Sequence, residues 1–187
     1  MKSPHKSARL VAALIAASAA QAASAQTTGG VTLYGRIDLN LTKITGGPLE
    51  MTRASNSRWG LRGSEGLGNK VNAIFQLESA FEADTGTPQT PYFRESWVGV
   101  SGALGTLRLG RSLGPAQRVA SNFDPHGTDG IGSFGSTSLL MRHSALVYQQ
   151  NALFYETPNF GGFRAFVAHQ LDESASISGD VTAVSLR

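Results

Sequence analysis

Charged side chains recur at alternate positions in several segments of this 187-residue chain. Arg36 and Asp38 lie two residues apart in VTLYGRIDLNLT (31–42), and Arg58 and Arg62 share the same parity in SRWGLRG. Alternate positions share one face of an extended strand, so each segment would present its charges to one side. Permanent charges on one face order water and bias the approach of ions without any proton transfer. Arginine suits this role, because its guanidinium is always charged and has a rigid shape.

Catalytic chemistry has little support in the sequence. Glu78 and Glu82 share one strand face, but no feature places a substrate between them. Residues 130–135 match G-x-G-x-x-G without the strand, turn and helix that a nucleotide-binding loop requires, and no G-x-S-x-G elbow is present. The acidic residues and the histidine of the same region, Asp124, His126 and Asp129, match no common metal-ligand spacing. We therefore expect neither an enzyme nor a bound metal or cofactor.

Segments of alternating or strand-forming residues are separated by turns and loops along most of the chain. In residues 31–42 the apolar Val31, Leu33 and Leu39 share one face. The Gly-bounded turns 66–69 and 102–105 suit the positive φ angles of tight hairpins. We expect an all-β antiparallel meander of about eight strands with no amphipathic helix over it. The expected strands are residues 31–42, 55–65, 70–84, 92–102, 106–111, 145–158, 163–171 and 180–187.

The first 25 residues have the composition of a secretory signal peptide. Three basic residues precede an apolar run, LVAALIAASAAQAA. The sequence ASA then ends at Ala25 and has the small-x-small spacing of a cleavage site. Removal of this segment takes three of the 16 lysines and arginines and none of the 13 acidic residues, which leaves 13 of each sign. The exported chain would be formally neutral, so we expect no nucleic-acid partner. It also contains no cysteine, so no disulfide holds it together.

Two kinds of barrel fit an exported chain of alternating strands. No stretch after residue 25 has the ~20 apolar residues of a membrane helix, so a membrane location would require strands. A membrane barrel turns its apolar face to lipid and its polar face to a water-filled interior, and a soluble barrel does the reverse. The predominance of arginine on the polar face favours the membrane barrel. The alternative is an exported soluble barrel or sandwich, a binding or adhesin domain with residues 112–143 as its recognition loop.

Four blocks follow one another along the chain: GGVTLYGRIDLNL, SRWGLRGSEGLGNKVNAIFQLESAFEADTG, RESWVGVSGALGTLRLGR and NALFYETPNFGGF. Together they resemble the general trimeric porins of beta-proteobacteria. The resemblance implies a homotrimer in the lipid of the bacterial outer membrane, with passive diffusion of small hydrophilic solutes and ions. It implies a transmembrane β-barrel of roughly sixteen strands, with residues 112–143 as a loop folded into the pore. It also places Arg58, Arg62 and Arg111 on the basic side of the constriction.

About eight of those sixteen strands are present, so we expect residues 26–187 to be the N-terminal half of such a barrel, from a fragment or a truncated chain. A complete barrel of eight strands has an interior just filled by side chains, with no room for a loop and a channel. The residues expected to line the pore or its constriction are Arg36, Asp38, Arg58, Arg62, Glu78, Arg108, Arg111, Asp124 and Asp129.

Overall fold

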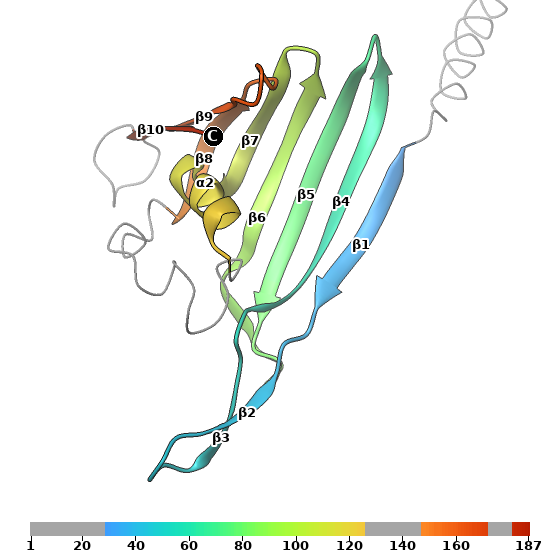
Figure 1. Ribbon diagram of the computed structural model, residues 1–187. Helices are drawn as coiled ribbons and strands as arrows, with labels where there is room; N and C mark the ends of the chain where they lie inside the picture. Colours follow the sequence, from blue (N-terminus) through green and yellow to red (C-terminus); the bar gives the residue numbers. More distant parts are fainter. Residues whose placement is uncertain (1–28, 126–146, 172–180) are drawn as a thin grey trace, which may run out of the picture.

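The computed structural model describes residues 29–125, 147–171 and 181–187, and its main feature is one antiparallel sheet (Figure 1). The sheet has eight strands in the order β1-β4-β5-β6-β7-β8-β9-β10. Their bounds are β1 Gly30–Arg36, β4 Ser57–Gly68, β5 Val71–Phe81, β6 Pro88–Gly102, β7 Gly105–Leu113, β8 Tyr148–Glu156, β9 Ala165–Gln170 and β10 Val181–Leu186. The expected antiparallel meander of about eight strands is therefore confirmed.

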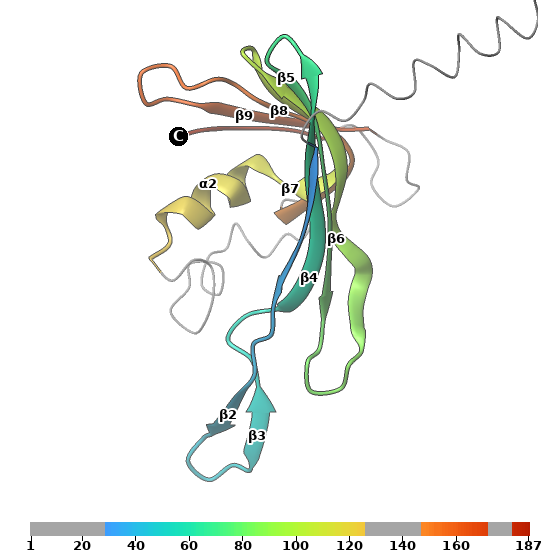
Figure 2. The same cartoon turned by 90° about the vertical axis from the view of Figure 1, so that its right-hand side faces the viewer.

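The sheet is strongly curved, and one helix lies on its concave side. In Figure 2, β4, β5 and β6 run upright, whereas β8 and β9 turn away from them toward the side on which the helix α2 (Pro115–Phe123) lies. The helix packs against β9 and β10. The three longest strands, β4, β5 and β6, have 12, 11 and 15 residues, and roughly 9–11 tilted residues suffice to cross a bilayer.

The two faces of the sheet have opposite chemistry. Residues paired across antiparallel strands share a face, and one such row runs from Leu33 to Leu61 to Leu77. This face is apolar and open: Leu33 is 70% exposed and Val98 is 57% exposed. The opposite, concave face carries buried polar groups such as Glu78 (7% exposed). A soluble barrel or sandwich would have the reverse arrangement, so the burial pattern opposes the soluble alternative and supports a membrane barrel.

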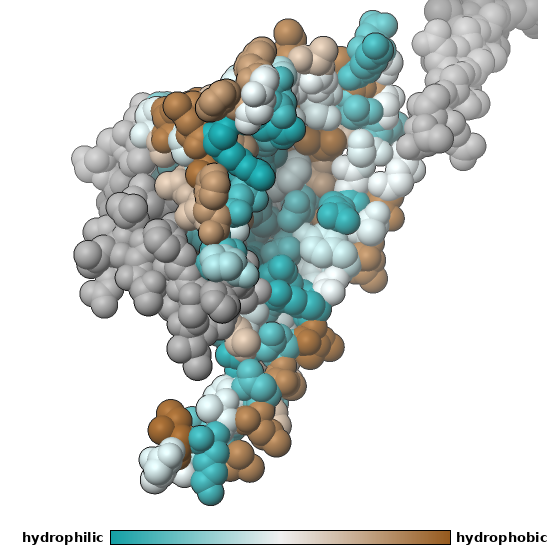
Figure 3. All heavy atoms as spheres, in the orientation of Figure 1, coloured by the Kyte–Doolittle hydropathy of each residue, from teal (hydrophilic) through white to brown (hydrophobic). Residues whose placement is uncertain are grey.

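Figure 3 views the concave side. Hydrophilic side chains fill the hollow between the upright strands and α2, and hydrophobic side chains show mainly along the outer edges. Among the described residues the buried apolar cluster is small, consisting of Ala152, Phe154 and Ala168 on β8 and β9. The sheet is thus held mainly by its backbone ladder and by polar contacts on the concave face.

The expected single strand at residues 31–42 is two strands in the structure. β1 ends at Arg36, and β2 (Asn40–Lys43) pairs with β3 (Leu49–Thr52) in a separate hairpin. At the break, the backbone N–H of Asp38 donates to the Ser57 hydroxyl at 2.9 Å, and the chain leaves the main ladder. Alternation continues through the break, so the period of two gave no sign of it. The expected turn between the first two strands also contains β3.

Two further boundaries differ from the expectation. β6 begins at Pro88, inside the segment expected to be a turn, and β7 continues through Leu113, into the segment expected to be a loop.

The expectation that no helix accompanies the sheet was wrong, because α2 follows β7 directly. It begins after Gly114 with Pro115 in its first turn, where the missing N–H of proline leaves no backbone acceptor unsatisfied. The remainder of the expected inward loop, residues 126–143, lies outside the described residues.

Candidate functional site

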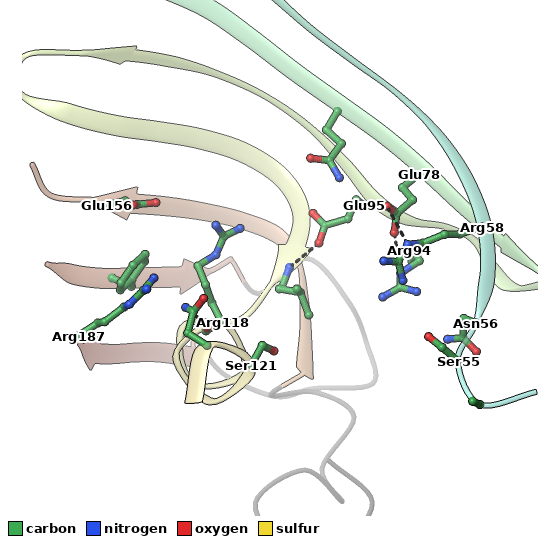
Figure 4. Close-up of a pocket in the computed structure, with 15 residues that line it drawn as sticks. Ser55, Asn56, Arg58, Glu78, Arg94, Glu95, Arg118, Ser121, Glu156 and Arg187 are labelled. Carbon is green, nitrogen blue, oxygen red and sulfur yellow. Dashed lines mark hydrogen bonds and ion pairs between the residues drawn. The ribbon is translucent and has the colours of Figure 1, made fainter. Parts of the chain in front are cut away.

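A polar cavity of about 600 Å³ lies on the concave side of the sheet (Figure 4). One wall comes from β4, β5 and β6 and the other from α2 and the strands near it. Its lining includes four arginines and three glutamates: Arg58, Arg94, Arg118, Arg187, Glu78, Glu95 and Glu156. Such a lining is far more polar than that of a typical small-molecule pocket, which is mostly apolar.

Glu78 is the centre of the polar network on the sheet wall. Its carboxylate accepts a hydrogen bond from the Tyr34 hydroxyl at 2.9 Å and pairs with Arg94 Nε at 3.0 Å. Arg58 Nε lies 3.7 Å from the same carboxylate. Buried carboxylates require such partners, because an unpaired charge at 7% exposure would be costly. Arg58 and Arg94 both point toward Glu78 in Figure 4.

A β-bulge places Arg94 on this wall. Glu78 is opposite Glu95, but Ser79 is opposite Phe93, so Arg94 is an extra residue of β6 at this point. A bulge turns the side chain of its extra residue away from the direction that strict alternation would give it. Adjacent residues of a regular strand face opposite sides. Because of the bulge, Arg94 and its neighbour Glu95 both line the cavity.

Glu95 is recessed in the same wall with its own donors. It is 5% exposed. Its carboxylate accepts from Trp97 Nε1 at 2.9 Å and from the backbone N–H of Leu113 at 3.2 Å. The Leu113 contact joins β6 to the end of β7, just before α2. Two carboxylates that face each other across neighbouring strands would repel, and the separate donors of Glu78 and Glu95 offset this repulsion.

Arg108 is enclosed by aromatic rings and does not line the cavity. It is 5% exposed, and its guanidinium carbon lies 5.2 Å from the Trp97 ring centre and 5.5 Å from that of Phe154. Arg108 Nη1 donates to the Ser112 hydroxyl at 3.3 Å. These contacts give Arg108 a packing role between β6, β7 and β8.

The structure brings some of the expected site residues together. Arg58 and Glu78 line the cavity, and Arg36 is opposite Arg58 across the β1–β4 ladder. Arg36 Nε donates to the carbonyl of Asn56 at 3.3 Å. Arg62 lies further along β4, with its guanidinium carbon 5.2 Å from the Tyr34 ring centre.

Four other expected residues lie either away from the cavity lining or outside the described residues. Asp38 follows β1, and its Oδ1 accepts from the Ala54 backbone N–H at 3.0 Å. Arg111 is opposite Ser96, and its Nη1 donates to Gln150 Oε1 at 3.1 Å. Asp124 is buried at the C-terminal end of α2. Asp129 lies outside the described residues.

Sequence reasoning missed Arg94, Glu95 and Arg118. The bulge disturbs the alternation of β6, so the period of two could not assign Arg94 and Glu95 to a face. Arg118 is on α2, which was expected to be loop. The one available signal was composition, since RES in YFRESWVGVSG places two charges inside a strand of apolar and small residues.

Neither a metal site nor a membrane-spanning helix is found in the described ranges. No three His, Asp or Glu side chains there are arranged to hold a metal ion. Within the same ranges, no helix combines the length and the apolar character needed to span a bilayer.

The sequence matches a known family over most of its length. Residues 10–186 match the family described as Gram-negative porin, and the chain belongs to that family. It is 36% identical over 177 residues to outer membrane porin protein 32 of Delftia acidovorans, covering 88% of this chain and 50% of that protein. It is 32% identical over 197 residues to an outer membrane porin protein of Bordetella pertussis, covering 89% of this chain and 50% of the relative.

Solved structures give the same result. An anion-selective porin from Comamonas acidovorans matches with a TM-score of 0.65 and 34% identity, over 80% of this chain and 49% of that one. A trimer form of OmpT, an outer membrane protein of Vibrio cholerae, matches with a TM-score of 0.60 at 19% identity, over 79% of this chain and 42% of that one, and supports the fold alone.

The chain spans about half the length of the relatives that it matches. The expected family and the expected localisation, the bacterial outer membrane, are confirmed by these relatives. The expected signal peptide and its cleavage site near Ala25 lie outside the described residues.

Proposed function

We propose that this chain forms part of the wall of an outer-membrane diffusion pore, which passes small hydrophilic solutes and ions and favours anions. One observation carries the proposal: the two arginines beside Glu78 are more exposed in the cavity wall than the carboxylate that they share. The side chains of Arg58 and Arg94 are 29% and 21% exposed, whereas that of Glu78 is 9% exposed. A solute in the cavity would meet guanidinium groups before it met the carboxylate behind them.

Two features support a water-filled pore. The polar, concave cavity lies opposite an apolar, exposed face, as in a barrel that is surrounded by lipid and filled with water. The helix α2 lies over the concave side (Figure 2) and contributes Arg118 to the cavity. We propose that α2 and the residues after it narrow the pore, and that Asp124 and Asp129 belong to this constriction with the arginines of the sheet.

A pore also requires a closed wall. Within the described residues, β1 pairs only with β4 in the main sheet, and β10 pairs only with β9. Open edges are costly in hydrocarbon, because each unpaired backbone group costs several kcal/mol. The relatives are about twice as long, and we propose that strands corresponding to their remaining half complete the barrel, which then assembles as a homotrimer.

Single-channel conductance in a planar bilayer under a KCl gradient tests the proposal, measured on this chain refolded together with the C-terminal half of a full-length relative, which supplies the remaining strands. We expect discrete, stable current steps and a reversal potential of the sign that chloride preference gives. Arg58→Gln and Arg94→Gln should each lower the chloride-to-potassium permeability ratio. Lys43→Gln on β2 removes the same charge from the separate hairpin and should leave the ratio unchanged.

Two outcomes would contradict the proposal. No steps from the chain completed in this way, beside a full-length relative that conducts in the same bilayers, would show that these residues do not form part of a pore wall. Steps with a reversal potential of potassium preference would retain the pore and overturn its preference for anions.

A further inference from the structure

Tyr148, the first residue of β8, lies beside two arginines, Arg94 of β6 and Arg111 of β7. Its ring centre is 5.4 Å from the guanidinium carbon of Arg94 and 5.3 Å from that of Arg111. The Tyr148 hydroxyl also accepts a hydrogen bond from Arg94 Nη2. A tyrosine face attracts cations within about 6 Å, so both the ring and the hydroxyl of this side chain hold Arg94.

Arg94 is consequently fixed from two directions. Glu78 Oε1 lies 3.0 Å from its Nε on one side, and Tyr148 holds its Nη2 on the other. A planar guanidinium with two separate tethers has a defined plane as well as a defined position. Because Arg94 belongs to the bulge of β6, the regular ladder alone does not determine where its side chain points.

The backbone around Tyr148 is tied on both sides. Leu113 and Tyr148 form the last pair of the β7–β8 ladder. The N–H of Gly114, directly before α2, donates to the carbonyl of Val147 at 2.9 Å. Tyr148 is therefore anchored at the junction of β7, β8 and α2, which suits it to hold the long side chain of Arg94 in place.

We propose that Tyr148 is a positioning residue for ion selection, which holds the Arg94 guanidinium at the cavity wall and thereby sets the preference for anions. This inference rests on the proposed pore function. Without the tether from Tyr148, the Nη2 end of the guanidinium is free to turn toward the carboxylates of Glu78 and Glu95, in addition to the Nε contact with Glu78 that already exists. Additional ion pairing would cancel more of its field in the cavity, and the anion preference would fall.

Substitutions of Tyr148 separate the contributions of its hydroxyl and its ring. Tyr148→Phe removes the hydrogen bond and retains the ring, and we expect it to lower the chloride-to-potassium permeability ratio on the order of twofold. Tyr148→Leu removes both contacts and should lower the ratio further. Tyr155→Phe is the matched control, because Tyr155 is on the same strand and donates its hydroxyl to the Leu104 carbonyl at 2.5 Å, away from the cavity lining.

A second set of variants asks whether Tyr148 acts through Arg94. In an Arg94→Gln background, Tyr148→Phe should have no further effect on the permeability ratio. An equal shift in both backgrounds would overturn the inference, because a general effect on folding or pore width does not depend on Arg94. Circular dichroism and the heat dependence of gel mobility would verify that each variant is folded.

The results for the unchanged chain keep the two proposals distinguishable. Anion-selective steps together with an unaltered ratio in both Tyr148 variants would overturn the role of Tyr148 and leave the pore function standing. No steps from the unchanged chain completed by the C-terminal half of a relative, beside a conducting full-length relative, would overturn the pore function and this inference with it.

Discussion

The Tyr34 hydroxyl on β1 donates to the Glu78 carboxylate on β5 at 2.9 Å, although β4 lies between the two strands. The residue of β4 between them is Gly60, which is opposite both Tyr34 and Glu78 in its two ladders. Because Gly60 has no side chain, the Tyr34 ring lies across β4. Gln76 Nε2, also on β5, donates to the same hydroxyl at 2.8 Å, so two hydrogen bonds join β1 to β5 across β4.

Gly60→Ala should destabilise the fold. A Cβ at this position would lie 2.6 Å from the Leu77 carbonyl oxygen and 2.7 Å from the Tyr34 ring. We expect the free energy of unfolding to fall by about 1–3 kcal/mol, the usual cost of overpacking. Urea unfolding in detergent micelles, followed by tryptophan fluorescence, measures the change. Gly30→Ala is the control, because no atom lies within 4 Å of its added Cβ. Equal stability of the two variants would contradict the crossing of Tyr34 over β4.

Glu78→Gln should increase the preference for anions. The substitution removes the negative charge that Arg58 and Arg94 share and retains an oxygen that can accept from Tyr34. The reversal potential in a KCl gradient should move further toward that of chloride, by an amount that shrinks as the salt concentration rises. Glu50→Gln, on the β2–β3 hairpin, removes an equal charge away from the cavity. If both variants shifted the potential equally, the site of the charge would not matter and the assignment of Glu78 would fail.

Arg108→Met should leave the ion preference unchanged. The methionine side chain can pack between the rings of Trp97 and Phe154, which now enclose the guanidinium. We expect stability to change by less than about 2 kcal/mol, because the lost contact with Ser112 is partly offset by the removal of a buried charge. Arg108→Ala, which leaves a cavity, should cost more. A large change in permeability ratio for Arg108→Met would contradict this expectation and support the pore-lining role that the sequence predicted for Arg108.

The carboxyl group of Glu82, beyond the end of β5, should titrate below its usual range. The hydrogen bond from Arg53 lowers its pKa, as does the one from Gln89. A carboxyl group whose pKa is lowered on folding stabilises the folded state above its unfolded pKa, and this contribution is lost as the pH falls through the folded pKa. Carbon-detected NMR of labelled glutamate should therefore show a higher pKa for Glu82 in Arg53→Gln. An identical pKa in both proteins would mean that the two side chains do not pair in solution.

The period of two was sufficient to identify the strands of the main sheet and the faces of those in which the alternation is regular. The apolar row of Leu33, Leu61 and Leu77 was visible in sequence because the ladder is regular there. The break after Arg36 was not visible, because the alternation continues into the hairpin with Leu39 and Leu41. Pairing partners, and not the local pattern, decide where one strand ends and another begins.

The sequence identified the site less completely than the fold. Arg58 and Glu78 were identified because they obey the alternation of regular strands. Arg94 was not, since a bulge adds one residue and exchanges the faces around it. Arg108 was assigned to the pore because alternation shows which face of the sheet a side chain is on, but not how deeply it is buried there. The rings that enclose Arg108 come from other strands, β6 and β8.

The β2–β3 hairpin extends away from the main sheet (Figure 2), and its turn includes Gly46 at φ +84°, with open space around it. Its ladder is separate from that of the eight strands. A change in the length of this turn therefore shifts no residue of the main register. For protein engineering, the turn is a position at which a foreign peptide could be inserted while the main sheet keeps its original pairing.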